Sequence, residues 1–245
     1  MRLLACAAFV AAQGMASPAT LDVSSLVVSP PTLICEVDMN QLKGEVRRLS
    51  WSPDSRNIHL QTAEPGVATH DYIVTVMDGV ISQAFGEPEW AAGYWAMKSD
   101  LGAPGVPSLR LEVQSDNRRT RPTPFAGGTA NGGAYTPDVK NPVDAFESEV
   151  TLRLLGLSIG NWINGAPMAG ETFGWGPAGS GAIVFVGRSD RLTLMDQRAR
   201  RKVVAAIKNT SMPAWSTDGT RLAFLQKIAK KRYRLMSSAV GRATI

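Results

Sequence analysis

A few residues in this chain have types and spacings that could support catalysis or metal binding. Residues 156–160 (GLSIG) match the G-x-S-x-G pattern, in which a nucleophilic serine occupies a tight turn between a strand and a helix. That chemistry needs a helix after Ser158 and a histidine further along, whereas a turn-rich segment follows and both histidines, His59 and His70, come earlier. Two histidines and few cysteines also do not make a structural zinc site. We therefore predict no catalytic residue, no metal site, no cofactor and no enzymatic activity.

Positive charge is concentrated in the last third of the chain. The whole sequence has a net charge of +5, but 14 Lys and Arg against 3 Asp and Glu lie from residue 181 onward. Two basic runs stand out, 198–202 (RARRK) and 227–232 (KIAKKR). Such runs between strands are usually solvated hairpin tips, but they also provide a surface for an anionic partner. The candidate binding residues are Lys227, Lys230, Lys231, Arg232, Arg200 and Arg201.

The N-terminus has the composition of a secretory signal peptide over residues 1–16. Arg2 precedes an apolar run over 3–12, and small residues follow at cleavage spacing. The run is too short to span a bilayer, and no later segment reaches eighteen consecutive apolar residues. We expect a periplasmic or extracellular protein that is not transmembrane and does not bind nucleic acid. After cleavage Cys35 is the only thiol, and its apolar surroundings predict a small buried side chain.

An aromatic repeat indicates how the chain is organised. The sequence LSWSPDSRNIHLQT contains Trp51, PAWSTDGTRLAFLQ contains Trp215, and the looser FGWGPAGSGAIVFVG contains Trp175. Each copy predicts a strand ending in Trp, a polar turn, and a second strand of alternating apolar residues. Trp95 and Tyr135 lie near the same spacing of about 40 residues, in weaker copies.

These copies resemble the Trp-Ser-Pro-Asp-Gly repeats of TolB-like, or WD-repeat-like, β-propellers, over about residues 33–85 and 173–237. The resemblance implies an all-β fold, a propeller of about six (or five) four-stranded antiparallel blades in one domain over 21–240. In such a ring the repeated tryptophans pack between blades, and the turns of the repeat are formed by short polar residues and glycine. The structural repeat residues are Trp51, Asp54, Trp175, Trp215, Asp218 and Gly219.

The two ends of the repeat region predict how the ring closes. Residues 33–37 and 46–50 are expected to be the third and fourth strands of an incomplete first blade, and the last blade has three strands before it stops near Ser238. Joining both ends in one sheet would cover exposed strand edges. A Gly/Pro-rich stretch at about 115–145 is expected to be an irregular insertion.

The predicted function is a non-enzymatic exported binding or scaffold module of the cell envelope. We expect a monomer that contacts a protein or an anionic envelope component through its basic residues. The resemblance to TolB-like proteins implies envelope assembly by analogy, since one fold carries many functions. Two alternatives remain open: a hydrolase with its site in the propeller channel, and the propeller accessory part of a peptidase system.

Overall fold

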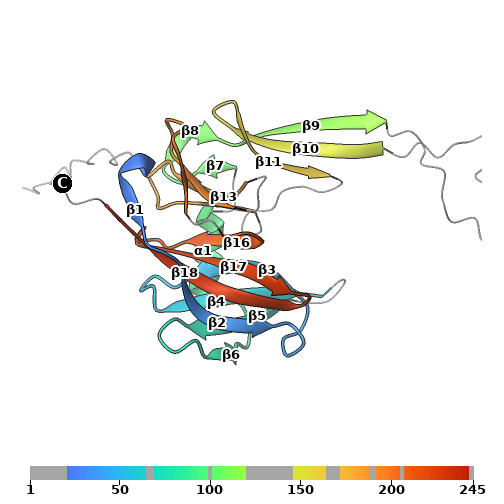
Figure 1. Cartoon of the computed structure of the whole chain (residues 1–245), viewed down its shortest axis with the longest axis vertical. Helices are drawn as coiled ribbons and strands as arrows, with labels where there is room; N and C mark the ends of the chain where they lie inside the picture. The colour runs from blue at the N-terminus through green and yellow to red at the C-terminus, as the bar shows by residue number, and fades with distance from the viewer. Residues whose placement is uncertain are drawn as a thin grey trace, which may run out of the picture.

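The protein is built mainly from antiparallel β-sheets, as the sequence predicts (Figure 1). The computed structural model describes residues 21–64, 69–98, 101–119, 146–163, 172–187, 191–204 and 207–242. The expected signal peptide and the Tyr135 copy of the repeat lie outside these ranges. No helix in the described ranges is long and apolar enough to cross a membrane.

The Trp51 repeat opens a four-stranded sheet whose strands follow one another in sequence. The strands are β3 (Glu45–Trp51), β4 (Asn57–Ala63), β5 (Thr69–Thr75) and β6 (Ile81–Gln83). The expectation that 46–50 is the last strand of an incomplete first blade is therefore wrong. The tight turn after Trp51 pairs this strand with β4 at once, and such a local pairing has a small loop-closure cost.

The Trp175 repeat forms a second four-stranded sheet of the same order. Its strands are β12 (Phe173–Trp175), β13 (Ile183–Val186), β14 (Leu192–Met195) and β15 (Arg201–Val203). Trp175 pairs with Ile183 across the first hairpin, as Trp51 pairs with Ile58 in the other sheet. The looser repeat, with no Asp in its turn, thus produces the same hairpin.

The C-terminal sheet contains strands from both ends of the described chain. It consists of β16 (Thr210–Trp215), β17 (Arg221–Ala229) and β18 (Arg232–Arg242), with β2 (Thr32–Asp38) and β1 (Leu26–Val28) both paired to β18. A short 3-10 helix, η1 (Val23–Ser25), precedes β1. The prediction that N-terminal strands complete the C-terminal sheet is confirmed, because β2 supplies the strand that follows β18.

Two smaller sheets lie at the other end of the molecule (Figure 1). One contains β9 (Glu112–Arg119), β10 (Phe146–Leu154) and β11 (Leu157–Ile163), and the other pairs β7 (Gly102–Ala103) with β8 (Val106–Arg110). The first part of the expected insertion at 115–145 is regular, since β9 pairs with β10 as far as Arg119. Residues 120–145 lie outside the described ranges.

Trp95 lies on a helix, which corrects the expectation of a blade strand at this position. Helix α1 (Glu89–Lys98) follows Pro88, has an acidic residue in its first turn and ends with Lys98. Its ten residues include no β-branched side chain. Pro before the helix, an acid at its start and a base at its end all favour helix over strand. The aromatic spacing alone was therefore misleading here.

The repeated tryptophans join neighbouring sheets. Trp51, Trp175 and Trp215 are each at most 1% exposed, and each belongs to a different hydrophobic core. Trp51 packs with residues of the C-terminal sheet, including Ala214, and Trp215 packs with Val184 of the β12–β15 sheet. The Trp51 and Trp215 indoles thus each pack against the sheet next to their own.

Candidate functional site

The exposed tip of the β17–β18 hairpin is the clearest basic surface. Ala229 pairs with Arg232, so Lys230 and Lys231 form the turn itself, and Lys231 has a left-handed φ of 61°. The side chains of Lys227, Lys230, Lys231 and Arg232 are all exposed. The structure therefore brings four of the predicted binding residues to one tip.

The hairpin is held in place by its neighbours. The backbone N–H of Lys227 donates to the carbonyl of Asn209, and the N–H of Met39 donates to the carbonyl of Lys231, each at 2.9 Å. Arg232 forms an ion pair with Glu36 at 2.7 Å. In the described part of the chain no carboxylate pairs with the three lysines, so their charges face solvent.

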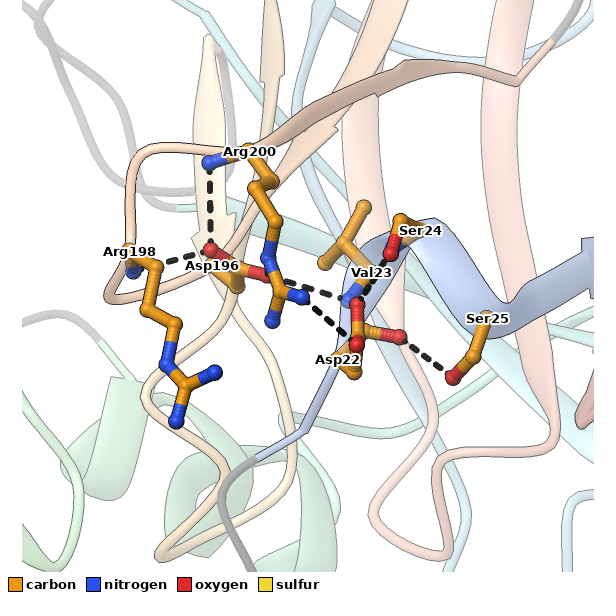
Figure 2. A network of polar contacts seen from close by, with 7 residues as sticks. All are labelled: Asp22, Val23, Ser24, Ser25, Asp196, Arg198 and Arg200. Atoms are coloured by element: carbon orange, nitrogen blue, oxygen red, sulfur yellow. Dashed lines mark hydrogen bonds and ion pairs between the residues drawn. The ribbon is translucent and has the colours of Figure 1, made fainter.

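Arg200, predicted with the same group, lies on another sheet and has a structural contact (Figure 2). It follows the turn after β14, and its guanidinium contacts Asp196 at 2.8 Å and Asp22 at 2.6 Å. The buried Asp196 carboxylate also accepts the backbone N–H groups of Val23 and Arg198. This cluster fastens the segment before β1 to the β14–β15 turn.

Arg201 also lies away from the hairpin tip. Its guanidinium donates to the carbonyl of Ser158 at 3.2 Å and lies 5.9 Å from the Phe185 ring centre. Ser158 itself is a strand residue of β11, just after a turn in which Leu155 and Gly156 both have positive φ. The G-x-S-x-G segment is therefore part of a β-hairpin rather than a strand-to-helix turn.

The Trp51 and Trp215 turns use the same set of hydrogen bonds. Ser216 Oγ donates to Asp218 Oδ1 at 2.6 Å and accepts the N–H of Arg221, as Ser52 does for Asp54 and Asn57. Hydrogen bonding from Ser52 and from the backbone lowers the pKa of Asp54. Burial alone would raise the pKa of Asp218, but its hydrogen bonds, that of Ser216 foremost, hold it below the usual value.

The two turns also touch each other, and Gly219 is constrained there. Ser55 Oγ donates to Asp218 Oδ2 at 3.4 Å, linking the β3–β4 turn to the β16–β17 turn. Gly219 has φ +79°, and a Cβ at this position would lie 2.8 Å from Pro177 Cγ in the β12–β13 turn. The repeated turns of three sheets therefore meet at one edge of the molecule.

A buried polar cluster covers one face of the β3–β6 sheet. His59 Nε2 and Gln61 Nε2 both contact Oδ1 of Asp71, at 2.8 and 3.1 Å. His59 Nδ1 has no hydrogen-bond partner among the residues that the structure describes. Burial lowers the pKa of His59 and outweighs the opposing effect of Asp71, so its imidazole is neutral at pH 7. The Trp90 ring lies edge-on to His59 at 6.1 Å.

Helix α1 covers the same face through Trp95. The Trp95 indole donates to Ser50 Oγ at 2.7 Å, and the guanidinium of Arg48 lies 5.6 Å from the centre of that ring. Arg48 also forms an ion pair with Glu87 at 2.7 Å. The positive charge on this sheet face is therefore already paired.

The end of α1 buries an amine against β16. Lys98 is 2% exposed, and its Nζ donates to the carbonyl of Trp215, which also accepts the hydroxyl of Tyr94 at 2.7 Å. The Lys98 amine lies 4.4 Å from the Tyr94 ring centre. Burial lowers the pKa of Lys98 to about 7, against a smaller opposing effect of Asp218.

This polar face was not predicted from the sequence, although the strands carry a signal for it. Ser50 lies opposite His59, and Gln61 lies opposite Asp71, so the polar residues alternate with the apolar ones on three adjacent strands. Alternate residues of a strand share one face of the sheet, so the matching positions on these three strands would place the polar side chains on one face. No single strand shows it clearly. Among the described residues there is no group of three or more His, Cys, Asp or Glu that could hold a metal ion.

Comparison with known proteins adds little to this geometry. No family model and no curated protein matches the chain. A protein assigned as TolB from Agrobacterium tumefaciens is 14% identical, with 82% of this chain and 62% of that one covered and a TM-score of 0.24. An acylaminoacyl peptidase of Pyrococcus horikoshii is 11% identical, with 75% of this chain and 28% of that one covered and a TM-score of 0.23. TolB of Acinetobacter baumannii is 12% identical, with 82% of this chain and 44% of that one covered and a TM-score of 0.21. The chain spans only part of the length of each. At such TM-scores these likenesses carry no weight for fold or function.

Proposed function

We propose that this chain is a non-enzymatic exported binding module that holds an acidic segment of a partner protein on the tip of the β17–β18 hairpin. The supporting observation is the exposure of Lys227, Lys230 and Lys231 on a backbone that is hydrogen-bonded on both sides. A rigid group of like charges attracts an oppositely charged partner without losing much conformational entropy on binding.

We further propose that the sheets are blades of one closed β-propeller over residues 21–240, with five or six blades. The pairing of β2 with β18 and the repeated tryptophan contacts between sheets support this arrangement. Residues 1–16 would direct export to the periplasm or the outside of the cell, and the module would act as a monomer. Fractionation of cells that express the full chain, followed by mass measurement, tests export and cleavage.

The binding proposal is tested with poly-L-glutamate as the acidic probe at low salt. Replacing Lys227, Lys230 and Lys231 by Ala should weaken binding at least tenfold. The matched control replaces Lys43, Arg47 and Arg56 by Ala, which removes the same charge from exposed positions around β3. Affinity should fall steeply with salt for the natural chain, because exposed charges are screened.

An equal loss of affinity for poly-L-glutamate in both triple variants would show that only net charge matters. That result would contradict a site at the hairpin tip. Vesicles that contain phosphatidylglycerol form the second arm. Binding to vesicles but not to poly-L-glutamate would identify an anionic membrane surface in place of an acidic protein, and would also reject the proposal.

A further inference from the structure

A pocket beside the buried polar cluster has the features of a second binding site. Its volume is about 390 Å³, within the usual range for small-molecule pockets. Asp71 and His70 of β5 line it, together with Gln83 of β6 and the segment 84–86. Phe85 stands at this segment and is fully exposed, which is unusual for a phenyl ring.

The Asp71 carboxylate is the acidic group that lines this pocket. The residue is only 6% exposed, and both of its side-chain hydrogen bonds, from His59 and Gln61, reach Oδ1. Within the described ranges no hydrogen bond or ion pair reaches Oδ2. One oxygen of a largely buried carboxylate is therefore free to accept from a ligand in the pocket.

Among the residues that the structure describes, no cationic side chain forms an ion pair with this carboxylate. His59 is neutral because burial lowers its pKa, and the Arg48 guanidinium is paired with Glu87. His70, the histidine that lines the pocket, has its Nε2 atom 3.7 Å from a carboxylate oxygen of Glu64. A carboxylate held out of water by neutral donors alone is costly, so a ligand cation would be favoured there.

We propose that this pocket binds a protonated primary amine attached to an apolar or aromatic group. The ammonium would donate to Asp71 Oδ2, and the apolar part would cover the exposed ring of Phe85. Such a ring also attracts a cation above its face. The same chemistry fits a free small amine or a lysine side chain of a bound protein. This site lies apart from the basic hairpin and binds the opposite charge, so it does not depend on the function proposed above.

The test uses phenethylammonium as the probe and 2-phenylethanol, its neutral counterpart, as the comparison, with binding measured by calorimetry. The natural chain should bind the amine at least tenfold more tightly than the alcohol. Asp71→Asn should reduce amine affinity to that of the alcohol and leave alcohol binding unchanged, since the amide oxygen still accepts from His59. Asp78→Asn, an exposed acid on the β5–β6 turn, is the matched control and should bind as the natural chain does.

Phe85→Ala tests the second contact and does not depend on the stability of the Asp71 variant, because this ring makes no contribution to the core. It should weaken both probes severalfold. Equal affinity for amine and alcohol, unchanged amine binding in a folded Asp71→Asn variant, or no effect of Phe85→Ala would each overturn the proposal.

A pair of peptides distinguishes the two sources of the amine. Acetyl-Phe-Lys-amide is compared with acetyl-Phe-norleucine-amide, which keeps the four-carbon side chain and lacks the terminal ammonium group. Selective binding of the lysine peptide, together with phenethylammonium, supports a protein side chain as ligand. Binding of phenethylammonium alone supports a free amine. Failure of phenethylammonium to bind at millimolar concentration would reject the site, whatever the peptides do.

Discussion

The indole N–H of Trp51 donates to the carbonyl oxygen of Ala214 at 3.1 Å, and this bond joins two residues that are 163 positions apart in the chain. Trp51 ends β3, and Ala214 directly precedes Trp215 at the end of β16. This bond connects the Trp51 copy of the sequence repeat to the Trp215 copy, through the tryptophan that defines the repeat. The contact combines a buried ring with a satisfied donor, so it stabilises and also orients the two sheets.

Removing the Trp51 contact should destabilise the protein. We expect Trp51→Phe to cost about 1–2 kcal/mol through the lost hydrogen bond and volume, and Trp51→Ala about 3–5 kcal/mol through the cavity. Urea unfolding followed by circular dichroism gives the free energy of unfolding. Met77→Ala, at a side chain that is 92% exposed, should change it by less than about 0.5 kcal/mol. Similar losses for Trp51→Ala and Met77→Ala would contradict the packing role.

Two glycine substitutions should have opposite signs. Gly219→Ala should cost about 1–3 kcal/mol, because φ is +79° and the new Cβ would lie 2.8 Å from Pro177. Gly93→Ala should stabilise by about 0.5–1 kcal/mol, because it lies on the exposed side of α1 with nothing within 4 Å of the added Cβ. Thermal unfolding of both variants measures the difference. Stabilisation by Gly219→Ala would show that the turn is more open than described.

Lys98 should make stability depend on pH in the alkaline range. Burial lowers its folded pKa to about 7 from 10.5, and the negative charge of Asp218 opposes this shift by raising the pKa. Between these values the unfolded chain binds the proton and the folded chain does not, so stability should rise with pH, by at most about 1.4 kcal/mol per pH unit. Below pH 7 the amine is protonated in both states, and its burial cost is fully present.

Lys98→Met tests this because it keeps most of the unbranched apolar length of the side chain and removes the charged amine. The free energy of unfolding, measured by urea at pH 7 and pH 9, should rise for the natural chain and stay nearly flat for the variant. Lys43→Met, at an exposed lysine, should keep the natural slope. An unaltered slope in Lys98→Met would mean that this amine is hydrated.

The Arg200 cluster should hold the N-terminal segment in place. Arg200→Met removes the contacts to Asp22 and Asp196, and leaves the Asp196 carboxylate buried with fewer donors. Amide hydrogen exchange over residues 23–28 should become at least tenfold faster, because local opening needs less free energy. Arg201→Met, an exposed neighbour without these ion pairs, serves as the comparison. Unchanged exchange in Arg200→Met would show that the pairing of β1 with β18 is sufficient by itself.

The sequence alone determined the hairpins of the repeat. A Trp-ended strand, a polar turn and an alternating second strand are local features, and their hydrogen bonds close within a few residues, as at Ser52 and Ser216. The same locality explains why the alternating second strand predicted after Trp215 is present as β17. Trp95 shows the limit of spacing as a signal, because its neighbours favour a helix.

Only the tertiary structure decided which residues meet across the chain. The six predicted basic residues divide between the β17–β18 tip and the sheet that holds Arg200 and Arg201, because sheet order, not charge, places them. The Asp71 pocket depends on three strands whose polar residues share one face and on a helix that buries them. Burial and the pKa values that follow from it are set by these distant neighbours, and no local pattern encodes them.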